Sequence, residues 1–204
     1  MSKDDEQILV IGRQSLFDGE SITFQGFASG ELIVTTMLEQ LHNFYEVRRR
    51  GDMETNPLFK QPIPYVVLRC GDEVFTYQRL IGGGEEKLHG RISIGVGGHM
   101  NEIVSASSFA FQIQQNMHRE LDEEVEFDKN GSTWYVLGFI NDDSDDVGRV
   151  HVGVLVIYEI EATDVKVREE GSMLGNWRSL DELSKPEVYL QLENWSKIAV
   201  DALK

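Results

Sequence analysis

The sequence predicts an α+β fold in which a central mixed β-sheet lies between helical layers. Short apolar runs typical of strands alternate with two longer segments of helical periodicity, at residues 105–127 and 187–203. The run at 148–160, GRVHVGVLVIYEI, is nearly continuous in apolar residues, which indicates a central strand buried on both faces. Such a sheet needs cover on both sides, and amphipathic helices supply it.

Length and composition predict one main domain with an N-terminal addition. The chain has 204 residues, of which 41% are hydrophobic, enough for one core of ordinary size. The stretch at 56–64, NPLFKQPIP, contains three prolines and is expected to be an ordered linker. We therefore expect a strand and helix extension at 1–60, too small for a core of its own, packed on a main domain at 61–204.

The charge and cysteine content limit the compartment and the partners. A formal net charge of −16 leaves no basic excess for binding a nucleic-acid polymer or an anionic membrane. The single cysteine, Cys70, excludes an internal disulfide, and neither a signal-like start nor an apolar run of roughly 18 residues is present. A cytoplasmic protein is expected, and a small diphosphate bound through a divalent cation remains compatible with the charge.

The N-terminal third predicts a strand at 7–11, QILVI, further extended structure around residues 17–27, and an amphipathic helix at 31–45. Arg48, Arg49 and Arg50 are expected to end this helix, where they either face solvent or grip a phosphate. A hairpin follows, with strands at 65–69 and 73–80 joined by Cys70, Gly71 and Asp72. The glycines at 82–84 form a turn and not a phosphate loop, because no G-K-S/T follows.

The segment at 105–127, SASSFAFQIQQNMHRELDEEVEF, is the helix that carries candidate chemistry. Spacings of three and four place Glu120, Glu123 and Glu124 on one face, beside a separate apolar stripe. Like charges repel one another there unless a cation lies among them, and carboxylate oxygens suit Mg²⁺ or Mn²⁺. The alternative is that an acid-rich chain produces this pattern by accident on a solvated helix.

The residues just before this helix strengthen the first interpretation. The run at 92–100, ISIGVGGHM, predicts a strand that passes into a turn at Gly95, Gly97 and Gly98. A strand, a glycine turn and an acidic helix in succession can bring backbone carbonyls and carboxylates to one point.

Gly97 and Gly98, followed by the run R-E-L-D-E-E-V that begins at Arg119, resemble the Nudix box, G-x5-E-x7-R-E-U-x-E-E-x-G-U with U apolar. The resemblance implies an α/β/α sandwich and a hydrolase that cleaves a diphosphate bond in a nucleoside diphosphate linked to another moiety, by water attack on phosphorus. It implies Mg²⁺ or Mn²⁺ as cofactor and Arg119 as a residue that orients a glutamate or pairs with Glu123. The implied metal ligands are Gly97, Gly98, Glu120, Glu123 and Glu124.

Two positions depart from the box. Phe111 stands where the box has a glutamate, and the only acid between Gly98 and Arg119 is Glu102, beyond an insertion. Glu126 replaces the glycine that ends the helix of the box, so the helix is expected to continue toward Asn130 and Gly131. These departures keep open a second function, a catalytically silent Nudix-fold module that binds a nucleotide and regulates.

Beyond the helix, strands are expected at 133–139, 148–160 and 165–169, with an acidic loop at 141–146. The run 177–183, WRSLDEL, resembles the W-x-x-x-x-E-L segment found near the end of Nudix domains. The helix at 187–203 is expected to cover the sheet, and its Trp195 stripe serves either the core or a homodimer contact.

The general base and the substrate contacts are less defined by the sequence. Glu124, Glu170 and the aspartates of the loop at 141–146 compete as base, with a box glutamate favoured. His99 is either a substrate contact or a structural hydrogen-bonder, and Arg149 and His151 either contact phosphate or pair with the acidic loop. The candidate substrate-binding residues are Arg79, Arg91, His99, Arg149 and His151.

Overall fold

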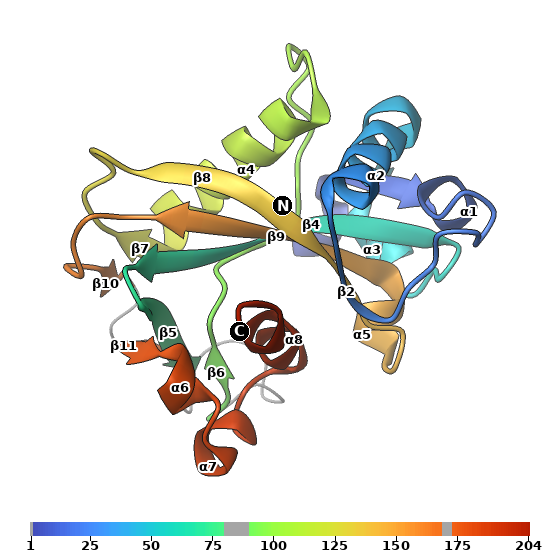
Figure 1. Ribbon diagram of the computed structural model, residues 1–204. Coiled ribbons are helices and arrows are strands. Elements are labelled where there is room, and N and C mark those ends of the chain that lie inside the picture. Colours follow the sequence, from blue (N-terminus) through green and yellow to red (C-terminus); the bar gives the residue numbers. More distant parts are fainter. Residues whose placement is uncertain (1, 80–89, 169–172) are drawn as a thin grey trace. The chain divides into compact units, whose positions relative to one another are not determined.

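Residues 2–79, 90–168 and 173–204 are described in the computed structural model of the chain, and every element below lies in these ranges (Figure 1). They divide into two compact units that are described separately. Unit 1 comprises Met1–Tyr65, Gly97–His118 and Val136–Leu155, and unit 2 comprises Val66–Val96, Arg119–Tyr135 and Val156–Lys204. Among the helices in these ranges, none has both the length and the apolar character that crossing a bilayer requires.

Two neighbouring strands of the larger sheet, β4 (Phe59–Cys70) and β9 (His151–Glu159), run in the same direction. At their beginnings the Lys60 ammonium donates to the His151 carbonyl, and at their ends the Ile160 N–H donates to the Arg69 carbonyl. Strand β5 (Glu73–Arg79) is antiparallel to β4 and to β11 (Met173–Ser179). The pairs of β2 (Gly26–Ser29) with β8 (Thr133–Asn141) and of β1 (Gln7–Gly12) with β3 (Tyr45–Arg49) are also antiparallel. The sheet is therefore mixed, which confirms the predicted fold class.

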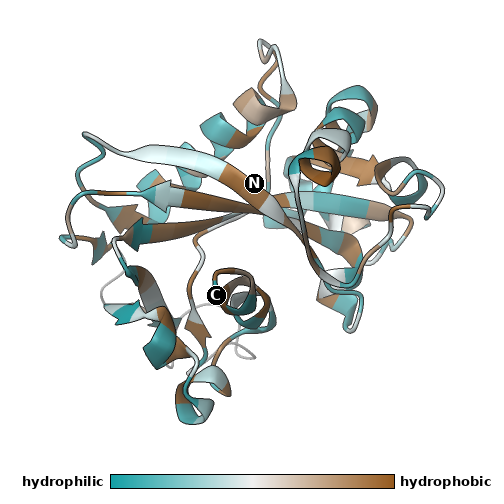
Figure 2. Cartoon of the chain, viewed as in Figure 1, coloured by the Kyte–Doolittle hydropathy of each residue, from teal (hydrophilic) through white to brown (hydrophobic). Residues whose placement is uncertain are grey.

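Strand β9 has the double burial that its sequence predicts, because every residue from His151 to Tyr158 is buried. Figure 2 shows the apolar character along this strand. Its predicted start at residue 148 is wrong, since a short helix, α5 (Asp146–Val150), precedes it. The Gly148 N–H donates to Asp145 Oδ1 at 2.7 Å, and a Cβ on Gly148 would lie 1.7 Å from the Asp142 carbonyl oxygen. Only glycine fits this turn.

Unit 1 contains β1 (Gln7–Gly12), which pairs with β3 (Tyr45–Arg49) and, at its end, with β4. Helix α2 (Glu31–Phe44) confirms the predicted helix to within one residue. The remaining elements of this unit are η1 (Lys3–Asp5), α1 (Arg13–Leu16), β2 (Gly26–Ser29), α3 (Arg50–Met53), and the major parts of β8 (Thr133–Asn141) and α4 (Phe109–Glu124).

The three arginines expected to end α2 lie beyond it, in β3 and α3, so that prediction was wrong. Each arginine is instead bound to acidic side chains. Arg48 pairs with Glu46, Arg49 with Asp5 and Asp52, and Arg50 with Glu6 and Glu54. The β1–β3 pairing and α3 thus bring carboxylates to these guanidinium groups. Arg48 and Arg49 remain exposed to solvent, which agrees with the first of the two alternatives.

The prediction of a linker at 56–64 was also wrong, because strand β4 begins at Phe59 and runs through this segment. Pro62 and Pro64 are two residues apart, so their nitrogens face the same edge of the strand. On that edge, Lys60 pairs with Ile11, and Val66 forms a bridge with Val96. The prolines fall between these two pairings, where no N–H donor is needed.

Unit 2 contains the predicted hairpin, with β4 joined to β5 (Glu73–Arg79) through Gly71 at φ 58°. Strand β11 (Met173–Ser179) pairs with β5 along its length, and β6 (Ile92–Ser93) is much shorter than the predicted strand. The predicted glycine turn at 82–84 and Glu170 lie outside the described residues.

The predicted C-terminal helix at 187–203 is two helices, α7 (Pro186–Tyr189) and α8 (Asn194–Ala202), after the short α6 (Leu180–Leu183). The break occurs because the backbone between α7 and α8 pairs with β6. The Ile92 N–H donates to the Gln191 carbonyl, and the Glu193 N–H donates to the Ile92 carbonyl. Ser196 on α8 then accepts a hydrogen bond from the Ile94 N–H at 3.2 Å.

Lys60 is a fully buried cation in unit 1. Its ammonium donates to Asp143 Oδ1 at 2.6 Å and to the carbonyls of Gly148 and His151 at 2.8 and 3.2 Å. Burial lowers the pKa of Lys60, and the Asp143 charge opposes this change. One side chain on β4 therefore ties down the loop before α5 and the start of β9.

Replacing Lys60 with methionine should lower the free energy of unfolding by about 3 kcal/mol, because two carbonyls and part of Asp143 lose a buried partner. Arg13 limits this loss of stability, because its guanidinium lies 2.9 Å from Asp143 and still pairs with it. The corresponding fall in melting temperature is about 6–12 °C. Lys166→Met is the control, since that side chain is 68% exposed and should change stability little. Equal melting temperatures for the two variants would contradict the stabilising role of Lys60.

Candidate functional site

The segment between Gly98 and helix α4 is fastened to the helix by two buried amide side chains. Asn116 Oδ1 accepts from the Asn101 N–H at 2.8 Å, and its amide donates to the Asn101 carbonyl at 3.0 Å. Gln112, one turn earlier, makes the same pair of bonds with Ile103 at 2.8 and 3.3 Å. The residues inserted relative to the box therefore form a fixed segment of unit 1.

Gly97 has a structural reason to be glycine. A Cβ at this position would lie 2.1 Å from the Pro64 carbonyl oxygen, so a side chain would force the backbone of β4 away. This close approach follows directly after the bridge between Val66 and Val96. The predicted role of the Gly97 or Gly98 carbonyl in binding a metal remains a prediction.

The acidic helix is α4, which is shorter than the predicted 105–127. Arg119 Nη2 lies 2.8 Å from Glu120 Oε1, and Arg119 Nη1 lies 3.3 Å from Glu123 Oε1. The predicted pairing of Arg119 with Glu123 is confirmed, and the guanidinium is shared with Glu120. Glu124 ends the helix, where its carbonyl accepts from the Arg168 N–H.

The three carboxylates differ in their environments. Glu120 is buried, whereas the Glu123 side chain is 58% exposed. Burial raises the pKa of Glu120, with Glu123 and Glu124 adding to the rise and Arg119 opposing it. This end of α4 therefore offers hard oxygen donors and a negative charge that one arginine only partly neutralises, which suits a divalent cation.

Of the two departures from the box, the one at Glu126 has a physical explanation. Phe111 lies on α4 with 37% of its surface exposed, and Glu102 accepts from the Tyr45 hydroxyl at 3.2 Å. Glu126 lies in β7 (Val125–Glu126), which pairs with β10 (Lys166–Val167), so its backbone is extended and needs no glycine. The predicted continuation of the helix toward Asn130 was wrong, because this pairing ends it.

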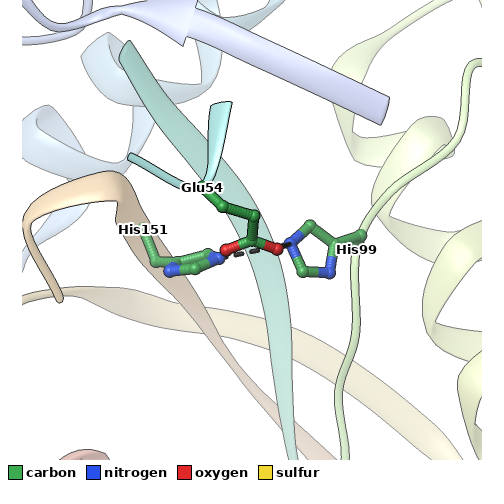
Figure 3. Close-up of side chains that lie close together, drawn as sticks. All are labelled: Glu54, His99 and His151. Atoms are coloured by element: carbon green, nitrogen blue, oxygen red, sulfur yellow. Dashed lines mark hydrogen bonds and ion pairs between the residues drawn. The ribbon is translucent and has the colours of Figure 1, made fainter. Parts of the chain in front are cut away.

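A second cluster in unit 1 consists of Glu54, His99 and His151 (Figure 3). His99 Nε2 lies 3.2 Å from His151 Nε2 and 3.6 Å from Glu54 Oε1. Burial lowers the pKa of His151, and its Nδ1 lies 2.7 Å from the Val147 carbonyl. Within the described ranges, this is the one set of three His, Cys, Asp or Glu residues whose ligand atoms all lie within 4.8 Å of one another.

The sequence indicates His99 and His151 only as separate candidates for substrate contacts, and it gives no signal for Glu54. The three residues are far apart in the sequence, and Glu54 follows a helix of only four residues, α3. No periodic pattern connects them, so only the tertiary structure brings them together.

The acidic loop, a candidate source of the general base, is occupied by structural contacts. Asp142 Oδ1 accepts from Gln25 at 2.7 Å, and Asp145 caps α5. Asp143 binds Lys60 and Arg13. Although burial raises the Asp143 pKa, these two cations bring it below its ordinary value. Asp146 pairs with Arg149 at 2.9 Å, the contact with the acidic loop that was one of the two expectations for Arg149, and a phosphate contact of Arg149 remains a prediction.

The remaining two candidate substrate residues are Arg91 and Arg79. Arg91 Nη1 donates to the Leu190 carbonyl at 3.0 Å in unit 2. Arg79 ends β5, where its backbone is in register with Met173. Their substrate roles remain predictions.

Comparison with known proteins supplies the family. Protein YmaB of Bacillus subtilis strain 168 is 45% identical over 206 residues, which span 100% of this chain and 100% of that protein. The crystal structure of Tm1382, described as a candidate Nudix hydrolase, has a TM-score of 0.80 and 29% identity, covering 97% of this chain and 98% of that one. No model of a protein family matches the sequence.

A more distant neighbour has the same fold. The Nudix domain of Shewanella oneidensis NrtR, solved with ADP-ribose, has a TM-score of 0.51 and 15% identity, covering 71% of this chain and 86% of that one. The predicted resemblance to the Nudix fold is thus confirmed. Through its identity with YmaB along the whole chain and with Tm1382 along nearly all of it, the chain belongs to the YmaB family within the Nudix hydrolase superfamily.

Proposed function

We propose that the protein is a metal-dependent hydrolase of phosphorus anhydrides that cleaves the diphosphate bond of a nucleoside diphosphate linked to another moiety. The observation that carries the proposal is the C-terminal end of α4, where Arg119 binds Glu120 and Glu123 and where Glu124 is the last residue of the helix. The Nudix fold supports the reaction class. The proposed setting is the cytoplasm.

The physical difficulty of this reaction is charge. The nonbridging oxygens of a diphosphate repel an attacking hydroxide, so positive charge has to be held beside them. A bound Mg²⁺ or Mn²⁺ supplies that charge and lowers the pKa of the attacking water. Glu120, Glu123 and Glu124 are the proposed ligands, and Arg119 keeps two of them in place when no ion is bound.

A box glutamate is the proposed general base. The contacts of the loop at 141–146 support this choice, because Asp142, Asp143 and Asp145 are engaged by Gln25, Lys60 and the α5 backbone. Glu124, the last residue of α4, is the first of the box glutamates to test in this role. The NrtR domain was solved with ADP-ribose, which makes this compound a reasonable first substrate to assay.

A nucleotide-binding regulatory module is the alternative. Phe111 at the usual glutamate position favours it, because phenylalanine cannot pair with the arginine of the box, and Arg119 binds two of the proposed metal ligands. A module of this kind would show ligand-dependent melting shifts with ADP-ribose and Mg²⁺ but no turnover. Release of phosphate-containing products from nucleoside diphosphate derivatives establishes the hydrolase instead.

Replacing Glu123 with glutamine should reduce turnover by at least about 100-fold, because a charged oxygen ligand is lost from the metal site. Without metal, the melting temperature should be unchanged or slightly higher. The exposed ion pair with Arg119 contributes only about 0–1 kcal/mol, and relief of repulsion from the other glutamates offsets its loss. Product release and thermal melting are the two measurements.

Glu126→Gln is the matched control for this variant. It removes the same charge three residues further on, from an exposed carboxylate that pairs with Arg168 at 3.6 Å. It should retain the turnover of the unmodified protein. Equal activity of the Glu123 and Glu126 variants would exclude Glu123 as a ligand, and a large loss of metal-free stability in the Glu123 variant would contradict the repulsion argument.

Removing divalent ions with a chelator should abolish hydrolysis, and adding Mg²⁺ or Mn²⁺ should restore it, because the carboxylates of α4 cannot themselves shield the diphosphate. Turnover is measured before chelation, after it and after each addition. Full activity in the presence of excess chelator would exclude the proposed mechanism.

A further inference from the structure

We propose that Glu54, His99 and His151 form a metal site of their own, which binds Zn²⁺ or a similar transition-metal ion and leaves one coordination position open. None of these residues belongs to the box, and the proposal does not depend on the hydrolase activity. All three lie in unit 1, on segments that are distant in sequence. Figure 3 shows their side chains pointing toward one another.

The distances fit one ion held by three ligands. Zn–N and Zn–O bonds are about 2.0–2.2 Å long, so two ligand atoms of a tetrahedral site lie about 3.3–3.5 Å apart. The two Nε2 atoms are 3.2 Å apart, and His99 Nε2 is 3.6 Å from Glu54 Oε1. The third pair, His151 with Glu54, lies within 4.8 Å. Small side-chain adjustments are enough to close the set around an ion.

The backbone selects the tautomer that His151 needs as a ligand. Its Nδ1 lies 2.7 Å from the Val147 carbonyl, and a carbonyl can only accept, so the proton is on Nδ1. The lone pair of a neutral ring is then on Nε2, the atom that faces His99 and Glu54. Carbonyl contacts of this kind orient histidine ligands in metal sites.

Further contacts hold the other ligands. Arg50 Nε donates to Glu54 Oε1 at 2.9 Å, and Arg50 Nη1 donates to Glu6 Oε2 at 3.1 Å. Glu6 Oε1 in turn accepts from the side chain of Asn101, two residues after His99, at 3.0 Å. A chain of contacts therefore links the segment that carries Glu54 with the segment that carries His99.

The donor set selects the class of ion. Two imidazole nitrogens and one carboxylate suit Zn²⁺, Co²⁺, Ni²⁺ or Fe²⁺, whereas Mg²⁺ prefers oxygen ligands and several waters. Three protein ligands leave the fourth tetrahedral position to water or to a ligand oxygen. The His99 side chain is 13% exposed and that of Glu54 35% exposed, so the site is open to solvent on the Glu54 side.

Without a metal, the same contacts amount to a hydrogen bond between two histidines beside a carboxylate. The two interpretations differ in their response to ions. Because the ligands come from distant segments, an ion that binds all three stabilises only the folded chain. With Zn²⁺ about 100-fold above its Kd, the melting temperature should rise by about 5–10 °C.

The test uses the full chain, stripped with a chelator and dialysed, then titrated with Zn²⁺ and with Co²⁺. Zn²⁺ binding is followed by calorimetry and thermal melting, and Co²⁺ binding by its visible spectrum. One ion per chain and a melting shift that excess Mg²⁺ does not reproduce are expected. Absence of a Zn²⁺-dependent shift would overturn the proposal.

Variants identify the ligands. Glu54→Gln and His99→Gln should weaken Zn²⁺ binding by about 10- to 100-fold or more, and both positions have solvent exposure that favours folding of the variants. His42→Gln, at an exposed histidine near the end of α2, should bind Zn²⁺ as the unmodified protein does. Glu123→Gln should also retain Zn²⁺ binding, which separates this site from the proposed hydrolase site. Unchanged affinity in both ligand variants would overturn the proposal.

Discussion

Shortage of positive charge is the constraint on which the arrangement of this protein depends. With 35 acidic and 19 basic side chains, several arginines are shared between two carboxylates. Arg119 binds Glu120 and Glu123, Arg50 binds Glu6 and Glu54, and Arg13 binds Glu20 and Asp143. The groups around Arg119 and Arg50 each hold two carboxylates against one arginine, whereas Lys60 balances the group around Arg13. Two of these three groups contain the proposed metal ligands, where a divalent cation would complete the neutralisation.

The sequence predicted correctly those helices and strands whose own residues carry the signal. The apolar run of β9, the periodicity of α2 and the hairpin through Gly71 each contain their own signal. Element ends were predicted less well, because they depend on partners. Strand β4 continues through Pro62 and Pro64 where neither needs a donor, and α4 stops at Glu124 because the next residues pair with β10. No window of sequence contains those partners.

The same distinction applies to the two candidate sites. Glutamates three and four residues apart share a helix face by geometry, so the acidic end of α4 could be predicted from spacing, as could the pairing of Arg119 with Glu123. Glu54, His99 and His151 come from segments that are distant in sequence, so only the folded chain shows that they lie together. The sequence did draw attention to Arg50 and to the acidic loop at 141–146. The side chains that these residues contact could be identified only from the folded chain.

The paired amide contacts of Gln112 and Asn116 have an evolutionary consequence. They fasten Asn101 and Ile103 to the helix independently of how many residues separate Gly98 from Phe109. That stretch can lengthen or shorten in descendants without rotating the glutamates of α4. A motif defined by fixed intervals loses its alignment at such a place, although the helix that follows is unchanged. An insertion at such a place can therefore erase the recognisable spacing of a signature while the helix and its glutamates stay in position.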